Sequence, residues 1–305
     1  MKYSNSLSLF FLTFAGLLCG ILFFRKDTHV GLTEQEFINL KFAAKQDNDI
    51  VFAGDSRILC DINPDIFEKQ LHLKTLNFGF NFLGYSKDYL DSVKCKLNIN
   101  SRRKIIVLGI TPRSLTPLNQ KVSEFRGQKE KSKFEKFEQL YFSKTLTKFA
   151  PISISSIFFA LKNQKIFREY NLNGWMPIEV IPPDESESIK TYTKLFNYNQ
   201  VSEAVINNIL VFVDECTQQR IEVYGFRPPV SETIYALEVQ EKSGFNHKKF
   251  INDFEQKGGR WLEFNSRQFE YADGSHLSRP FANTFCMILS DSLSNNAKDV
   301  TNTKN

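Results

Sequence analysis

Two short motifs, far apart in the chain, carry residue types that can do chemistry together. Gly54-Asp55-Ser56 follows a short apolar run, and Asp273-x-x-His276 lies in a polar stretch near the C-terminus. A hydroxyl nucleophile needs a base that takes its proton and a carboxylate that holds the base in the productive tautomer. Ser56, His276 and Asp273 can fill these three roles in that order. The chemistry they predict is attack on an acyl carbonyl.

Each motif also has a purely structural interpretation. Asp55 or Ser56 can cap the N-terminus of a helix, and Asp273 can cap a turn. His276 is one of four histidines, and it alone has an aspartate three residues before it in an expected loop. The occurrence of both motifs in one chain, one after a strand and one in a loop, favours the catalytic interpretation.

In these motifs and their order the chain resembles the SGNH (GDSL-type) hydrolases. Those proteins carry serine in Gly-Asp-Ser after the first strand and Asp-x-x-His near the C-terminus. The resemblance covers about residues 49–293 in outline, and only the two motifs are specific. Within this superfamily, the chain more closely resembles the membrane-anchored SGNH-like proteins of bacterial cell-surface polysaccharide acylation. These include proteins similar to the alginate O-acetylation factors. This resemblance implies an esterase or O-acyltransferase for acyl esters of a surface glycan, without metal or organic cofactor.

The family pattern further implies donors to the oxyanion of the reaction. The backbone N–H of Ser56 is one. Family members add a glycine after the second strand, here Gly84 or, as second choice, Gly79, and an asparagine after the third, where this chain has Thr111. A hydroxyl is a shorter donor than an amide, so this departure leaves room for a transferase or for a domain that no longer catalyses. Asn81 is an alternative donor from the second loop.

Three arginines follow strands on the expected cleft side, namely Arg57, Arg113 and Arg227. A guanidinium matches planar oxyanions, so these residues are candidates to bind an anionic substrate group such as a uronate or a phosphate. The alternative is that they are ordinary surface arginines.

The elements that must position these residues follow from the apolar pattern. Short runs rich in β-branched or aromatic residues predict buried parallel strands over 50–53, 75–78, 104–110, 221–226 and 261–264. Helical patterns lie between several of them and over 279–293. The alternation predicts an α/β fold, a three-layer α/β/α sandwich with a central parallel sheet of about five strands. Ligands bind such sheets at the carboxyl ends of the strands, where Ser56 is expected.

A long insertion over about 115–200 separates the third and fourth expected strands. It opens with a Lys/Glu-rich stretch, 121–148, in which Phe134, Phe137 and Tyr141 recur at helical spacing. The spacing predicts an amphipathic helix that packs on the core or, alternatively, a lid or docking surface for a membrane partner. Residues 163–184 read as irregular loop, and the polar tail 295–305 is expected to be disordered.

The N-terminus carries an uncharged apolar run, residues 6–24, which is long enough to cross a bilayer as a helix. No Ala-x-Ala site follows it, so an uncleaved anchor over 1–26 is favoured over a cleaved signal peptide, and the soluble domain then covers 27–294. Basic residues flank the run on both sides. The orientation therefore comes from the resemblance, which places the domain outside the cytoplasm.

Composition bounds the remaining choices. The chain of 305 residues has 42% hydrophobic residues, which is enough for a sizeable core. Its net charge is +5, but no nucleic-acid-binding motif accompanies the basic residues, so no nucleic-acid partner is expected. Besides Cys19 in the apolar run, four dispersed cysteines allow either two disulfides or free thiols: Cys60, Cys95, Cys216 and Cys286. A rival interpretation is a non-catalytic SGNH-like partner that binds a glycan or a membrane acyltransferase, which Thr111 and the basic insertion favour.

Overall fold

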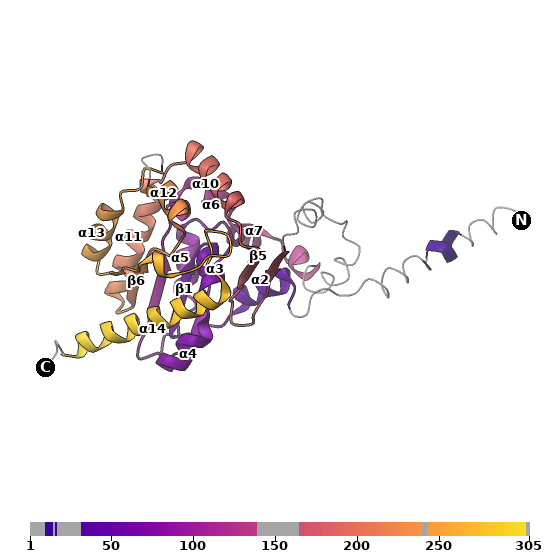
Figure 1. The fold of residues 1–305 in the computed structure, drawn as a ribbon. Helices are drawn as coiled ribbons and strands as arrows, with labels where there is room; N and C mark the ends of the chain where they lie inside the picture. The colour runs from indigo at the N-terminus through magenta and orange to yellow at the C-terminus, as the bar shows by residue number, and fades with distance from the viewer. Residues whose placement is uncertain (1–9, 15, 17–31, 139–164, 240–242, 303–305) are drawn as a thin grey trace, which may run out of the picture.

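The computed structural model describes residues 10–14, 16, 32–138, 165–239 and 243–302 (Figure 1). Most of the apolar run 6–24, including Cys19, therefore lies outside the described residues, as does the part of the insertion over 139–164 with Tyr141. Within the described part of the chain, no helix combines the length and the apolar character needed to cross a membrane. The anchor over 1–26 stays a prediction.

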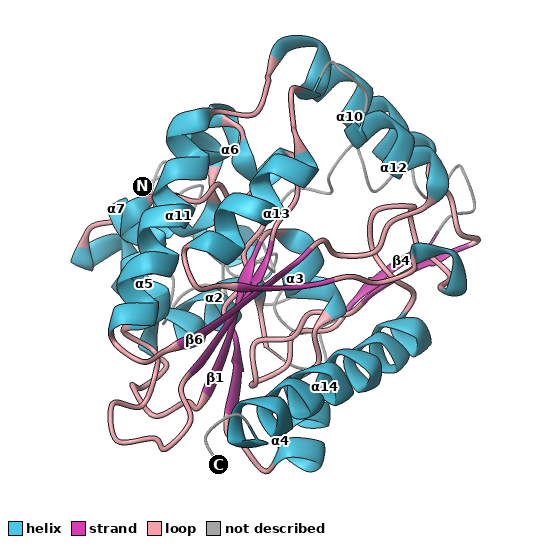
Figure 2. Cartoon of the chain, turned by 90° about the vertical axis from the view of Figure 1, so that its left-hand side faces the viewer, coloured by secondary structure: helices cyan, strands magenta, loops and turns pink. Residues whose placement is uncertain are grey.

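A five-stranded parallel sheet forms the centre of the fold (Figure 2). Its strands stand in the order β2-β1-β3-β6-β7. Their bounds are β1 Ile50–Gly54, β2 Thr75–Asn77, β3 Ile105–Gly109, β6 Glu222–Phe226 and β7 Arg260–Leu262. Every residue of β1 and β3 is buried, as expected of central strands covered on both faces. The prediction of an α/β fold with a parallel sheet of about five strands is confirmed.

Helices pack on both faces of this sheet, because successive side chains of a strand point to opposite faces. Val51 and Ala53 of β1 join one hydrophobic cluster, and Ile50 and Phe52 join a second. The first cluster is closed by α5 (Lys87–Lys94), α11 (Glu203–Gln218) and α13 (His247–Gln256). The second is closed by α4 (Pro64–Leu71) and α14 (Arg279–Asn302), which lie side by side in both ribbon views (Figures 1 and 2).

The carboxyl ends of the three central strands lie in one row. Gly54 of β1 is in register with Gly109 of β3, and Gly109 is in register with Phe226 of β6. The loops that follow these strands therefore start from the same edge of the sheet. This is the edge at which parallel α/β sheets bind their ligands.

The insertion begins at this edge with the 3-10 turn η1 (Arg113–Leu115), followed by α6 (Pro117–Val122) and α7 (Glu124–Glu130). Beyond α7, Phe134 is exposed by 74% and Phe137 by 53%, so neither packs in the core of the described structure.

Residues 163–184 are not irregular throughout, contrary to the prediction. They contain an antiparallel pair, β4 (Lys165–Arg168) and β5 (Ile178–Ile181). All four residues of β4 are exposed, so the strand lacks the apolar alternation by which a half-buried strand is recognised in a sequence.

Two further helices, α10 (Ser186–Tyr198) and α12 (Glu232–Val239), pack on each other beside the sheet. Tyr192 and Phe196 of α10 meet Ile234 of α12 in a small third hydrophobic cluster. The chain also has a helix before the first strand, α2 (Glu34–Ala43), and a short one directly after it, α3 (Ser56–Asp61).

Two expectations about the remaining segments are corrected or decided. The last helix, α14, continues to Asn302, so the tail is helical as far as that residue rather than disordered from 295. The four cysteines of the described domain are free thiols, three of them buried and Cys95 exposed.

Candidate active site

Ser56 lies at a tight turn between β1 and α3. Gly54 ends the strand, and a Cβ at this position would lie only 2.5 Å from Cγ1 of Ile58, so a side chain here would force the helix away from the strand. Asp55 is the N-cap of α3, because its Oδ1 accepts the backbone N–H two residues ahead at 3.1 Å. Capping thus falls to Asp55, and the hydroxyl of Ser56 is available to another partner.

The structure brings Ser56, His276 and Asp273 together in one hydrogen-bonded chain. Ser56 Oγ lies 3.0 Å from Nε2 of His276. Nδ1 of His276 lies 2.9 Å from Oδ2 and 3.1 Å from Oδ1 of Asp273. With the Nδ1 proton held by the carboxylate, Nε2 presents its lone pair to the Ser56 hydroxyl. This is the arrangement that general-base activation of a serine requires.

The loop that carries His276 is built around the carboxylate of Asp273. Oδ1 of Asp273 accepts the backbone N–H groups of Ser275 at 3.0 Å and of His276 at 2.9 Å. The loop is fastened to α3 one residue later, where the backbone N–H of Leu277 donates to Oδ1 of the buried Asp61 at 3.1 Å. Ser56 and the loop of His276 are therefore anchored to the same short helix.

His276 and Asp273 shift each other's pKa in opposite directions. Burial lowers the pKa of His276, but the charge of Asp273, the hydrogen bond to it and the charge of Asp61 together raise it above the ordinary value. Burial alone would raise the pKa of Asp273. The charge of His276 and the hydrogen bonds from His276 and two backbone N–H groups outweigh burial, so the pKa of Asp273 lies well below its ordinary value. Asp273 therefore stays ionised and supports positive charge on the imidazole when a proton arrives.

Ser56, His276 and Asp273 line one cavity of about 430 Å³ at the carboxyl edge of the sheet. Its size is within the range typical of small-molecule sites. The other walls come from the loop after β2, from η1, from the β4–β5 pair and from α10, including Asn81, Phe82, Arg113, Ile178 and Tyr192.

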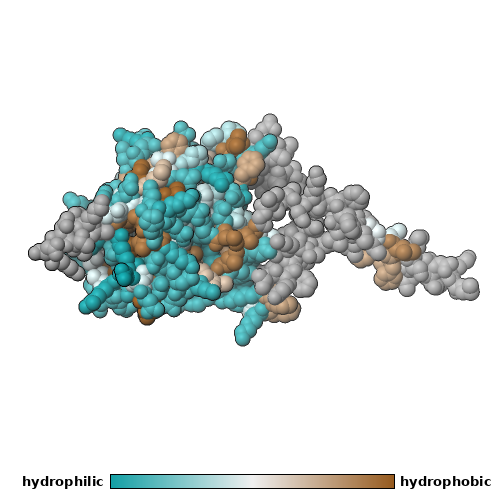
Figure 3. Space-filling model, turned by 90° about the horizontal axis from the view of Figure 1, so that it is seen from below, coloured by the Kyte–Doolittle hydropathy of each residue, from teal (hydrophilic) through white to brown (hydrophobic). Residues whose placement is uncertain are grey.

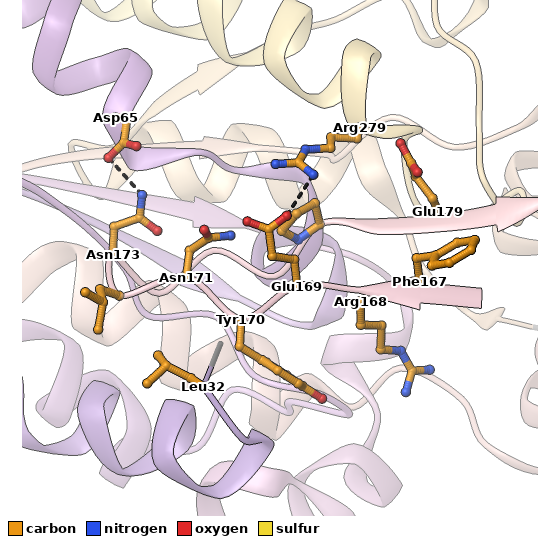
Figure 4. A pocket seen from close by; sticks show the side chains of 12 residues that line it. Leu32, Asp65, Phe167, Arg168, Glu169, Tyr170, Asn171, Asn173, Glu179 and Arg279 are labelled. Atoms are coloured by element: carbon orange, nitrogen blue, oxygen red, sulfur yellow. Dashed lines mark hydrogen bonds and ion pairs between the residues drawn. The ribbon is translucent and has the colours of Figure 1, made fainter. Parts of the chain in front are cut away.

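A larger cavity, of about 1000 Å³, has none of the three catalytic candidates in its lining (Figure 4). Four of its polar side chains are paired with one another: Arg279 pairs with Glu169 at 2.8 Å, and Asn173 donates to Asp65 at 2.8 Å. Arg168 of β4 lines both cavities. The smaller cavity is therefore the candidate active site.

Three of the four expected oxyanion donors have other roles in the structure. The N–H of Gly79 donates to the side chain of Asn77 at 3.0 Å. A Cβ at Gly84 would lie 2.3 Å from the backbone nitrogen of Gln120, so this glycine allows close packing on α6. Neither glycine lines the catalytic cavity.

Thr111 is fully buried, and its hydroxyl donates to Oδ2 of Asp55 at 2.7 Å and accepts the N–H of Ser114 at 3.0 Å. It supports the turn that carries the nucleophile instead of facing the cavity. The expected donor that remains at the site is the backbone N–H of Ser56, which has no intrahelical partner at the first position of α3. Asn81 also lines the cavity, but its backbone N–H and its side-chain amide both donate to Glu124.

The three arginines separate into two groups. Arg57 is fully buried, and its guanidinium donates to Glu238 and, at 2.8 Å, to Tyr192. Arg227 pairs with the same carboxylate of Glu238 at 2.6 Å. Neither lines the catalytic cavity, so the structure does not place them as ligands of a substrate there. Arg113 does line it.

Three side chains that shape this region were missed by the sequence analysis: Phe82, Tyr192 and Glu238. The two aromatic residues carry no motif. Glu238 leaves a usable signal, since it stands four residues after the buried Ile234 and therefore on the apolar side of α12. A carboxylate on the apolar side of a helix indicates a buried cationic partner.

Comparison of the chain with protein-family models, with curated proteins and with solved structures gave no match.

Proposed function

We propose that the chain is an SGNH-like serine esterase or O-acyltransferase that acts on acyl esters of a cell-surface glycan. The observation that carries the proposal is the chain of hydrogen bonds from Ser56 through His276 to Asp273 at the carboxyl edge of a parallel sheet. The order of the Gly-Asp-Ser and Asp-x-x-His motifs supports the same family. The glycan substrate rests on the resemblance alone.

In the proposed reaction, Ser56 Oγ attacks the acyl carbonyl while Nε2 of His276 takes its proton. The negative charge that develops on the carbonyl oxygen is stabilised by the N–H of Ser56 at the start of α3. His276 then returns the proton to the leaving alkoxide, and an acyl-Ser56 intermediate remains. Water releases the acyl group as an acid, or a glycan hydroxyl accepts it as a new ester.

A second candidate is a non-catalytic partner that binds a glycan or a membrane acyltransferase. The observation that favours it is the scarcity of oxyanion donors, because Gly79, Gly84 and Thr111 are engaged elsewhere. Loss of one such donor costs about 10²–10³ in rate in enzymes that depend on it. The two candidates differ in one measurable step, the formation of a covalent acyl-Ser56 intermediate.

The test is pre-steady-state release of 4-nitrophenol from 4-nitrophenyl acetate by the full-length protein in detergent. An enzyme that accumulates the acyl-Ser56 intermediate gives a burst of 4-nitrophenol whose amplitude matches the protein concentration, followed by slower turnover. If the reaction is acyl transfer, an added glycan acceptor accelerates the slower turnover. Ser56→Ala removes the burst. The control Ser92→Ala, at a half-buried serine of α5 that does not line the cavity, retains it. Absence of both a burst and steady turnover that depends on Ser56 supports the non-catalytic partner.

The proposed location is a single-pass anchor over residues 1–26 with the domain outside the cytoplasm. Surface glycans are met only on that side of the inner membrane. Protease added to spheroplasts of bacteria that express the chain should then digest the domain. A domain that survives until the membrane is broken contradicts this topology.

A further inference from the structure

Arg113 is the cationic residue after β3 that reaches the candidate active site, and it differs from Arg57 and Arg227 in its charge balance. Those two share the buried carboxylate of Glu238. Arg113 forms no ion pair within the described residues, and its buried Nε–H has no hydrogen-bond partner there. Buried nitrogens of Arg57 and Arg227 also lack a hydrogen-bond partner. Arg113 differs because its guanidinium lines the cavity without a counter-charge among the described residues, which leaves it ready for an anion from outside the chain.

Two aromatic rings fix the guanidinium of Arg113, and we call Phe82 and Tyr192 the aromatic clamp. The guanidinium carbon lies 4.8 Å from the ring centre of Phe82 and 5.4 Å from that of Tyr192. Cation–π contacts of this kind stabilise the charge and hold its plane while leaving N–H groups at its rim for hydrogen bonds. All three side chains line the cavity that contains Ser56.

The two rings of the aromatic clamp are positioned in different ways. Tyr192 accepts a hydrogen bond from Arg57 at 2.8 Å, so it is tied to the residue directly after the nucleophile. Phe82 has a backbone φ of +50° and is exposed by 51%. A bulky residue in the left-handed region is strained, and such strain gathers at functional sites. In this backbone conformation the ring of Phe82 lies against Arg113 and is not buried in the core.

The other charges in the cavity do not add to a general positive field. Besides Arg113 and Arg168, the lining contains three acidic residues, Glu34, Glu187 and Asp273, the last of them paired with His276. Selection of an anion must therefore come from direct hydrogen bonds to Arg113. A guanidinium forms parallel hydrogen bonds to carboxylate and phosphate oxygens, which a neutral hydroxyl cannot match.

We infer that Arg113 binds a carboxylate or phosphate group of the substrate, so that the acyl ester presented to Ser56 belongs to an acidic glycan. This inference rests on the proposed function for the identity of the substrate, but binding at Arg113 needs no catalysis. It makes Arg113 a residue that selects the substrate, separate from the residues that react.

The test measures binding to the full-length Ser56→Ala protein in detergent, so that a failure of catalysis cannot hide the result. Three probes are titrated by calorimetry: glucuronate, glucose 1-phosphate and neutral glucose. At least one anionic probe should bind about tenfold more tightly than glucose, as expected for a charged hydrogen bond. The probe that is favoured distinguishes a carboxylate ligand from a phosphate ligand.

Arg113→Gln, introduced into the Ser56→Ala protein, should abolish the preference for the anionic probe. Arg113→Lys in the same background should keep only part of the preference, because lysine cannot form the parallel hydrogen bonds. Arg126→Gln, which removes a surface arginine paired with Glu130, should leave the preference intact. Equal binding of all three probes, no measurable binding of either anion, or a preference that survives Arg113→Gln would each overturn the inference.

Discussion

Ser56 Oγ and His276 Nε2 lie 3.0 Å apart although 220 residues separate them in the chain. Their meeting depends on α3, which begins with Ser56 and ends with Asp61, the residue that accepts a hydrogen bond from the loop of His276. One short helix therefore links Ser56 to the loop that carries His276.

In the proposed reaction Ser56 and His276 act in one step, so the effects of their variants should not be additive. Ser56→Ala and His276→Ala should each lower kcat/KM for 4-nitrophenyl acetate by roughly 10⁴-fold or more, and the double variant should be hardly worse than either single one. Steady-state kinetics on the three variants checks this. Losses that multiply in the double variant contradict a shared role.

The pH dependence of activity should have an acidic limb set by His276. The imidazole must be neutral to take the Ser56 proton, and Asp273 and Asp61 raise its pKa above the ordinary value, which is about 6.5. Activity is therefore lost as pH falls through a midpoint above about 6.5. In Asp273→Asn, loss of the negative charge moves this midpoint to lower pH and lowers the rate. A limb that does not move with this variant shows that another group titrates.

Thr111 should act on the turn of the nucleophile and not as an oxyanion donor. Thr111→Val removes the hydrogen bond to the buried Asp55 and should lower the free energy of unfolding by about 1–3 kcal/mol, while Thr111→Ser should keep most of it. Urea unfolding of the three proteins checks the order. Unchanged stability in Thr111→Val, with activity lost, would point back to a role in the cavity.

Glu238 should be the most sensitive carboxylate of the fold outside the catalytic loop. Glu238→Gln leaves the buried Arg57 and the nearly buried Arg227 without their shared counter-charge, which should cost about 3–5 kcal/mol of stability. The matched control is Glu232→Gln, also on α12, which breaks the exposed pair with Arg267 and should cost less than about 1 kcal/mol. Similar melting temperatures for the two variants would contradict the buried network.

The sheet is well predicted from the sequence because each buried strand leaves its signal in a few consecutive residues. The central strands β1 and β3 are buried on both faces, and this leaves uninterrupted apolar runs such as Ile50–Gly54. The proximity of Ser56, Asp273 and His276 is predictable for a similar reason, since each motif combines residue type with its position after a strand or in a loop. The strand β4 escapes notice because exposure on both sides removes the pattern.

The wall of the cavity is not predictable in the same way, because it depends on the direction of groups in loops. The N–H of Gly79 is taken by Asn77, and the hydroxyl of Thr111 turns toward Asp55, which no spacing in the chain reveals. Arg57 and Arg227 look like cleft residues until α12 brings Glu238 to them. Only the packed structure separates Arg113 from these two.

The most direct test of the account is the site of covalent labelling by a fluorophosphonate, read by mass spectrometry of the digested full-length protein. A single adduct is expected, on the peptide that contains Ser56. His276→Ala should form it far more slowly, and Ser56→Ala should not form it at all. An adduct on another residue, or equal labelling of the wild-type and Ser56→Ala proteins, would contradict the assignment of Ser56 as an activated nucleophile.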